Sequence, residues 1–106
     1  MADNILIVDY GAGNLRSAAK AVEKVAAGRT VRVSAEAAAV AGASHIILPG
    51  VGAFADCMAG LSRLPGMIAA LEDAVLQRNI WFLGICVGMQ LLFEVGHEHG
   101  THAGLG

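Results

Sequence analysis

The stretch Ile80-Trp-Phe-Leu-Gly-Ile-Cys-Val-Gly-Met-Gln-Leu-Leu-Phe93 decides how this chain folds. Its first half is a short apolar run of aromatic and branched residues, which is typical of a strand buried on both faces. Its second half is amphipathic at helical spacing, and we expect Met89, Leu92 and Phe93 to share one face of a helix. The stretch therefore predicts a strand that turns directly into a helix.

The turn between the two halves reads Gly84-Ile85-Cys86-Val87-Gly88. Gly-x-Cys-x-Gly is the cysteine form of the nucleophile elbow, in which the flanking glycines leave room for a crowded backbone. The turn would place Cys86 at the amino end of the next helix, where backbone N–H groups and the helix dipole favour the thiolate. Cys86 is therefore a candidate nucleophile. Its alternative role as a small buried hydrophobe stays open on this motif alone.

Length, composition and charge limit what the chain can be. It has 106 residues, of which 56% are hydrophobic and 15% charged, enough for one compact domain over residues 1–106. The apolar share is high for so short a domain, which indicates either extensive packing or a surface that something else covers. The net charge of −2 gives no electrostatic footprint for nucleic acid, and no apolar run is long enough to span a membrane.

The two cysteines, Cys57 and Cys86, form neither a disulfide framework nor a metal-ligand spacing. This favours reduced thiols in a cytoplasmic protein. Cys57 falls in a predicted helix and is interpreted as structural. The run His97-Glu98-His99 with His102 could catch a divalent ion, but a solvated glycine-flanked loop is the preferred interpretation. We expect neither a metal nor a cofactor.

Apolar runs alternate with helical patterns along the chain. We expect strands at residues 5–8, 30–33 and 45–48, and a fourth from residue 80 to the turn. We expect helices at residues 15–27, 54–61 and 67–78, and a weak helix or turn at residues 35–43. Because the strands are continuous apolar runs, the pattern predicts a doubly wound α/β fold, with a parallel sheet covered by helices on both faces.

The loops after three of these strands are rich in glycine: Asp9–Asn14, Pro49–Gly52 and Gly84–Gly88. Right-handed crossovers align the carboxyl ends of parallel strands along one edge, where such sheets bind their ligands. We therefore expect the three loops to meet at one crevice.

An acyl-transfer cysteine needs hydrogen-bond donors aimed at the developing oxyanion. In an elbow, one donor is the N–H of the residue after the nucleophile, which is Val87 here. We expect the second to be the N–H of Val51, because glycine at 50 and 52 frees that peptide to point inward or to flip. An ordinary turn into a helix is the alternative for this loop.

Two segments, Leu48-Pro-Gly-Val-Gly-Ala-Phe54 and Leu83-Gly-Ile-Cys-Val-Gly-Met-Gln-Leu-Leu92, together resemble the class I glutamine amidotransferases. With Asp9–Ser17, the likeness is closest to the glutaminase branch that serves imidazole glycerol phosphate synthase in histidine biosynthesis, and it runs from the first strand to the end of the chain. The family commonly has Leu where this chain has Val87, a small departure because only a backbone N–H is needed there.

The resemblance implies a flavodoxin-like sheet and a glutaminase reaction. Cys86 would attack the side-chain amide of glutamine, form a glutamyl thioester and release ammonia to a barrel-fold synthase subunit, the partner in a heterodimer. The resemblance also implies that Gly52, Gln90 and Glu98 hold the substrate glutamine and that Asn14 faces the partner.

The family completes its catalytic triad with a His and a Glu near the end of the domain. His97, His99 and His102 are in the wrong place to supply the base, and the chain given stops at Gly106. We therefore expect the N-terminal half of an amidotransferase domain, inactive alone, with an unpaired sheet edge beside the fourth strand that invites association.

The alternative is a non-catalytic flavodoxin-like binding module. Gly11-Ala12-Gly13 matches the start of a dinucleotide fingerprint, but Arg16 stands where the third glycine is needed.

Overall fold

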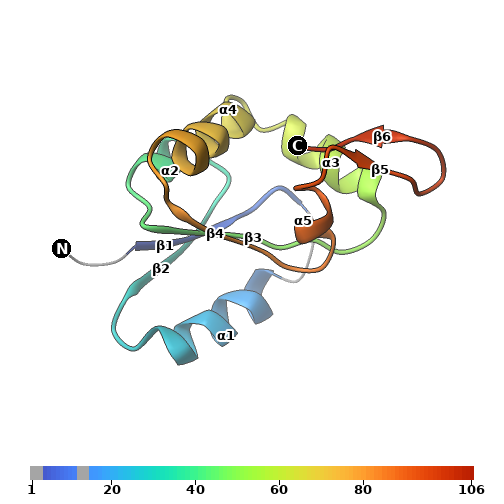
Figure 1. The fold of residues 1–106 in the computed structure, drawn as a ribbon. Coiled ribbons are helices and arrows are strands. Elements are labelled where there is room, and N and C mark those ends of the chain that lie inside the picture. The colour runs from blue at the N-terminus through green and yellow to red at the C-terminus, as the bar shows by residue number, and fades with distance from the viewer. Residues whose placement is uncertain (1–3, 12–14) are drawn as a thin grey trace.

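Four parallel strands form one sheet in the computed structural model, which describes residues 4–11 and 15–106 (Figure 1). The strands are β1 (Asn4–Val8), β2 (Thr30–Ser34), β3 (His45–Leu48) and β4 (Trp81–Gly84), in the order β2-β1-β3-β4. This order confirms the predicted doubly wound, flavodoxin-like topology. The first crossover places β2 on one side of β1, and the second places β3 on the other side, so the direction of winding reverses between β1 and β3. In such sheets the ligand crevice opens at the carboxyl ends of these two strands.

Helices cover both faces of the sheet, as predicted (Figure 1). One face carries α1 (Leu15–Ala26), and the other carries α2 (Ala38–Ala41), α3 (Phe54–Ser62) and α4 (Met67–Glu72). The predicted helix at residues 67–78 changes character halfway, because Asp73–Gln77 forms a π-helix, η1. Within the described part of the chain, no helix has the length and apolar character needed to cross a membrane.

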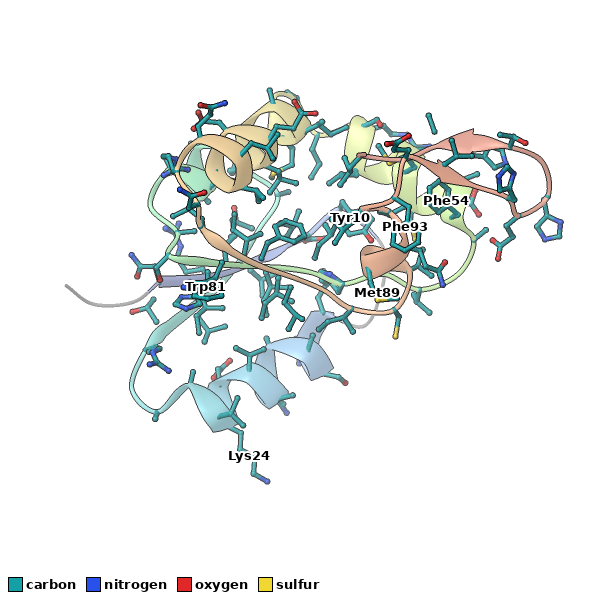
Figure 2. All side chains as sticks on the ribbon, in the orientation of Figure 1. Tyr10, Lys24, Phe54, Trp81, Met89 and Phe93 are labelled. Carbon is teal, nitrogen blue, oxygen red and sulfur yellow. The ribbon has the colours of Figure 1, made fainter. Side chains whose placement is uncertain are left out.

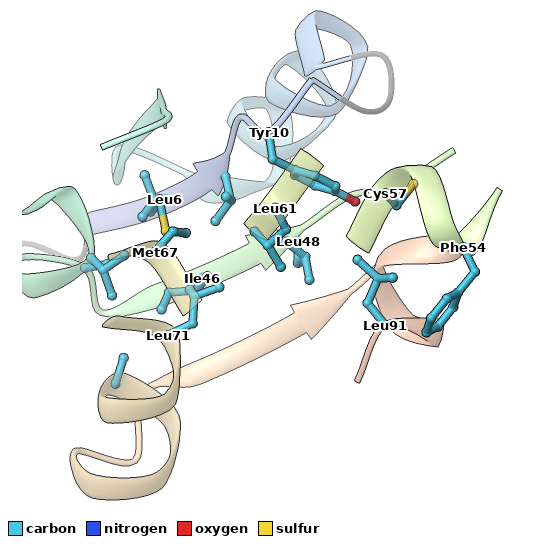
Figure 3. Packing of buried hydrophobic residues seen from close by; sticks show 14 residues of the cluster. Leu6, Tyr10, Ile46, Leu48, Phe54, Cys57, Leu61, Met67, Leu71 and Leu91 are labelled. Atoms are coloured by element: carbon cyan, nitrogen blue, oxygen red, sulfur yellow. The ribbon is translucent and has the colours of Figure 1, made fainter. Parts of the chain in front are cut away.

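Alternation along the central strands divides the core into two layers. Ile5 and Ile7 of β1 face α1 with Ile47 of β3, whereas Leu6 and Val8 face α3 and α4. The second layer is the larger, and Figure 3 shows Leu48, Leu61 and Met67 within it. Residues on both sides of β1 and β3 are buried, as their continuous apolar runs predicted.

The prediction that the fourth strand is buried on both faces was wrong. Trp81 is 74% exposed and Leu83 is 55% exposed, while Phe82 between them packs against the larger core layer. Pairing places Leu83 beside Ile47, whose side chain packs under α1. Trp81, two residues earlier and paired with His45, lies on the same face (Figure 2). The smaller layer under α1 is built on β1, β2 and β3, which leaves this face of β4 open.

The helix after the elbow is also shorter than predicted. The helix α5 (Val87–Gln90) is a single turn, followed by a hairpin of β5 (Val95–Gly96) and β6 (His102–Ala103). The prediction that Met89, Leu92 and Phe93 form the apolar face of this helix was wrong. Met89 and Phe93 are exposed, and Leu91 is fully buried instead. The N–H of Leu105 donates to the carbonyl of Leu91 at 2.7 Å, so the chain after β6 returns to pack at this position.

Shortening Leu91 is expected to destabilise the fold far more than shortening Met89. The Leu91→Ala change leaves a cavity in the core and is expected to lower the free energy of unfolding by about 3 kcal/mol. The Met89→Ala change removes an exposed side chain and is expected to cost less than about 1 kcal/mol. Urea denaturation followed by circular dichroism measures both. If both variants lose the same free energy of unfolding, Met89 contributes as much to the core as Leu91, and the predicted apolar face would be correct after all.

Candidate active site

Cys86 sits at the turn from β4 into α5 with a backbone conformation of φ 55° and ψ −123°. Residues with a side chain rarely adopt a positive φ of this size, so the turn stores backbone strain. The carbonyl of Cys86 accepts hydrogen bonds from the N–H groups of Met89 at 3.0 Å and Gln90 at 3.3 Å, and so begins the helix. The cysteine is exposed. This combination of a strained turn and an accessible thiol is the geometry of a nucleophile elbow.

The two glycines of the elbow make room for close backbone packing. A Cβ at position 88 would lie 1.9 Å from the carbonyl oxygen of Leu48, and a Cβ at position 84 would lie 2.6 Å from the Cα of Met89. The same Leu48 oxygen accepts the N–H of Ile85 at 3.0 Å. The elbow therefore rests directly on the end of β3.

The loop Pro49–Gly52 meets the elbow backbone to backbone. A Cβ at position 50 would lie 2.5 Å from the nitrogen of Gly88 and 3.0 Å from the carbonyl carbon of Val87. Within residues 4–11 and 15–106, no hydrogen-bond acceptor is found for the N–H of Val51 or that of Val87. The two N–H groups expected to bind an oxyanion thus lie on neighbouring segments and make no competing bond there.

The helix dipole contributes less at Cys86 than the sequence suggested. The macrodipole is the sum of aligned peptide dipoles, and α5 supplies only one turn of them. The conformation of the turn and the adjacent loop, rather than a long helix, define the surroundings of the thiol.

Gln90 and Glu98 line one cavity of about 280 Å³, formed between α5, α3 and the β5–β6 hairpin. Its other lining residues are Phe54, Phe93, Val95, Gly96 and His97. The volume lies near the lower end of small-molecule sites, which run from about 300 to 1,000 Å³. Among the described residues that line this cavity, neither Cys86 nor Gly52 is found. Cys86 nevertheless lies only one helical turn before Gln90 along the chain. Gly52 adopts a φ of +92° in the neighbouring loop.

Glu98 has a structural contact that the sequence did not reveal. Its Oε1 accepts the N–H of Phe54 at 3.1 Å, at the first residue of α3. The residue before this helix supplies no side-chain cap, so a carboxylate from 44 residues further along the chain takes that place. The contact fixes the hairpin over the start of α3.

The three histidines of the hairpin make their described side-chain contacts within the hairpin itself. Oγ1 of Thr101 is 3.4 Å from Nδ1 of His97, and Nε2 of His102 donates to the carbonyl of His99 at 3.4 Å. Among the described residues, no histidine bonds to Cys86, and no group of three His, Cys, Asp or Glu side chains could hold a metal. Asn14, expected at a partner interface, falls outside the residues that the structure describes.

Tyr10 and Cys57 are buried beside the loop, and sequence reasoning gave neither a role in the site. The Tyr10 hydroxyl donates to the carbonyl of Pro49, and the Cys57 thiol donates to the carbonyl of Val51 at 3.3 Å. Burial raises the pKa of the Tyr10 hydroxyl above its ordinary value, and the adjacent Cys57 raises that pKa further. A lone tyrosine two residues after the end of a buried strand was the available signal.

The raised pKa of Tyr10 predicts a specific loss of stability in alkali. Below pH 10 the hydroxyl keeps its proton in both the folded and the unfolded chain. Above pH 10 the unfolded chain releases that proton first, so stability falls by up to about 1.4 kcal/mol per pH unit. Urea denaturation between pH 9 and 11 should show a steeper loss of stability in the wild type than in Tyr10→Phe. Tyr10 is the only tyrosine, so tyrosinate absorbance follows it directly, and a folded-state midpoint near pH 10 would contradict the prediction.

Comparisons with known proteins identify the family of the chain. A family model described as glutamine amidotransferase class-I matches residues 6–101. Proteins named imidazole glycerol phosphate synthase subunit HisH are similar: the chain is 50% identical over 106 residues to that of Rhodospirillum rubrum and 52% identical over 103 residues to that of Zymomonas mobilis. Each match covers 96% of this chain but only 50% and 48% of the relative. The chain thus spans about half the length of the relatives it matches.

Proposed function

Since the chain belongs to the class-I glutamine amidotransferase family, we propose that it carries the nucleophile of a glutaminase site. The similarity to HisH proteins supports a narrower assignment, the glutaminase subunit of imidazole glycerol phosphate synthase in histidine biosynthesis. The observation that carries the proposal is the contact between the elbow of Cys86 and the Pro49–Gly52 loop.

The proposed reaction begins at the sulfur of Cys86. The thiolate attacks the side-chain carbonyl carbon of glutamine and forms a C–S bond, while the carbonyl electrons move onto oxygen. As the tetrahedral intermediate collapses, the C–N bond breaks and the nitrogen takes up a proton and leaves as ammonia. Water then cleaves the glutamyl thioester, which yields glutamate and regenerates the thiol. No described residue is assigned as the general base.

The N–H groups of Val51 and Val87 are proposed as the oxyanion donors. The two segments that carry these donors are in backbone contact at Gly50 and Gly88, and this contact limits how far the donors can move relative to each other. Donors fixed in this way stabilise the oxyanion without having to reorganise during the reaction.

The proposed glutamine site uses Gly52, Gln90 and Glu98. One carboxylate oxygen of Glu98 already accepts the N–H of Phe54, which orients the group and leaves the other oxygen for the amino group of the substrate. Gln90 lines the same cavity as Glu98, and its side-chain amide can hydrogen-bond to the polar end of glutamine.

The proposed destination of ammonia is a synthase subunit of barrel fold, bound in a cytoplasmic heterodimer. Asn14 is proposed to face this partner. Neither a cofactor nor a metal enters the proposed reaction, and two free cysteines fit a reducing compartment.

Covalent labelling tests the proposal. The chloromethyl ketone analogue of glutamine is expected to alkylate Cys86, with loss of chloride, and mass spectrometry locates the adduct. Free glutamine should slow this labelling, whereas asparagine, one methylene shorter, should protect much less. Iodoacetamide provides the reference rate, because it needs no substrate site.

Cys57 is only 1% exposed, so its escape from labelling would not by itself support a substrate site. The decisive readout is protection by glutamine. If glutamine and asparagine protect Cys86 equally, or neither protects it, the non-catalytic binding module becomes the better assignment.

A further inference from the structure

The peptide between Gly50 and Val51 is flanked by two carbonyl groups that buried side chains hold. The carbonyl of Pro49 precedes it and accepts the Tyr10 hydroxyl, and the carbonyl of Val51 follows it and accepts the Cys57 thiol. The flanked peptide contains the N–H of Val51, the proposed oxyanion donor. Both neighbours of this peptide are therefore fixed from the side of the protein core.

Tyr10 reaches the loop from the carboxyl end of β1. The residue is 5% exposed, and Figure 3 shows its hydroxyl directed toward Cys57. Its backbone is fixed as well, because Gly60 of α3 approaches so closely that a Cβ there would lie 2.6 Å from the carbonyl oxygen of Tyr10. The hydroxyl is thus presented by a rigid segment, and a Cβ at Gly50 would lie 2.8 Å from it.

Cys57 reaches the loop from the first turn of α3. Its N–H donates to the carbonyl of Ala53 at 3.1 Å, which places the thiol on a regular helical turn. Cys57 is 1% exposed, so the donor end of the bond from its sulfur to the Val51 carbonyl is buried, whereas Val51 at the other end lies at the surface. In a trans peptide the N–H points away from the C=O, so this bond turns the N–H of Gly52 away from α3.

The space beside the loop is open. A cavity of about 380 Å³ is lined by Tyr10, Val51 and Cys57 together with Gly11, Asp56, Gly60 and Arg63. The Val51 side chain is 62% exposed. The Val51 side chain therefore does not fix the Gly50–Val51 peptide, which is restrained on one side by the close packing of Gly50 against the elbow and from the core by the two hydrogen bonds that flank it.

We propose that Tyr10 and Cys57 are positioning residues for the oxyanion loop. They anchor the Pro49 and Val51 carbonyls, and in this way keep the Val51 N–H available to the group bound at Cys86. The inference rests on the proposed function, since it gives the two buried donors a role in that reaction. Neither side chain touches the substrate.

The test compares labelling of Cys86 in three variants with the wild type. Cys57→Ala and Tyr10→Phe remove one donor each and are expected to slow labelling by the chloromethyl ketone analogue about tenfold, because losing an oxyanion donor outright costs about 10²–10³. Cys57→Ser keeps a donor of similar shape and is expected to stay within about threefold of the wild type. Iodoacetamide should alkylate Cys86 at the same rate, within about twofold, in all four proteins.

A purely structural role would alter both reagents equally or leave serine as slow as alanine, and either result would overturn the inference. Unchanged or faster analogue labelling in Cys57→Ala would do the same. Carbonyl ¹³C chemical shifts report the two hydrogen bonds independently of any reaction. Tyr10→Phe should shift the carbonyl signal of Pro49, and Cys57→Ala should shift that of Val51. If glutamine fails to protect the wild type, the proposed function fails, and unmoved carbonyl signals would separately reject the anchors.

Discussion

Replacing Cys86 with glycine is expected to abolish labelling by the glutamine analogue and yet to yield a more stable protein than replacement with alanine. Cys86→Gly and Cys86→Ala both remove the only proposed nucleophile, so no adduct should form at this position. They differ in backbone strain, because the φ of 55° at residue 86 is costly for any residue that carries a Cβ. That strain amounts to about 1–3 kcal/mol, and the greater freedom of glycine in the unfolded chain offsets about 0.5–1 kcal/mol.

Urea denaturation should therefore place Cys86→Gly about 1 kcal/mol above Cys86→Ala in free energy of unfolding. The wild type should resemble Cys86→Ala, since the thiol itself is exposed and adds little packing. Equal stability of the two variants would contradict a strained elbow. A glutamine-protected adduct in either variant would show that another residue is the nucleophile.

Replacing Gly88 with alanine is expected to cause the largest loss of stability of any single methyl group added to this site. The new Cβ would start 1.9 Å from the Leu48 oxygen and 2.8 Å from its carbonyl carbon. Since β3 is held between β1 and β4, the elbow rather than the strand must move. That movement would stretch the bond from the Ile85 N–H to the same oxygen. We expect a cost of about 3–5 kcal/mol.

The matched control is Gly42→Ala. Gly42 has a φ of −95°, and a Cβ there would meet nothing within 4 Å, so the change is expected to stay within about 0.5 kcal/mol of the wild type. Urea denaturation measures both variants, and the analogue-labelling rate of any folded Gly88→Ala protein should also fall. A Gly88→Ala protein as stable as the control would mean that the elbow does not rest on β3.

The backbone of the elbow determines how its chemical groups are arranged. The glycines allow Val87, Gly88 and Gly50 to come into contact, and that contact brings the two proposed donor segments together. The strain at Cys86 and the crowding at Gly88 are thus consequences of the same close approach. A site of this kind tolerates little change in backbone volume, even though the thiol itself is open to solvent.

The sequence alone determined the sheet and its loops. Short apolar runs specify β1 and β3, and an alternating run after Gly28 specifies β2, each within a residue or so, because the periodicity of a strand is visible within the strand itself. The glycine spacing around Cys86 predicted the elbow in the same way. Only glycine at 84 and 88 leaves room for the backbone of the turn, so the requirement can be recognised within five consecutive residues. The glycine-rich strand ends also predicted that the Pro49–Gly52 loop would meet the elbow, because the carboxyl ends of parallel strands lie along one edge of the sheet.

Only the tertiary structure decided which side chains support that elbow. Leu91 rather than Met89 fills the core because the chain returns to it through Leu105, and β4 stays open on one face because α1 packs over its neighbours. Glu98 meets the start of α3 from 44 residues away, and Tyr10 meets Pro49 from 39 residues away. Such partners depend on how distant segments pack, and periodicity within one segment contains no information about them.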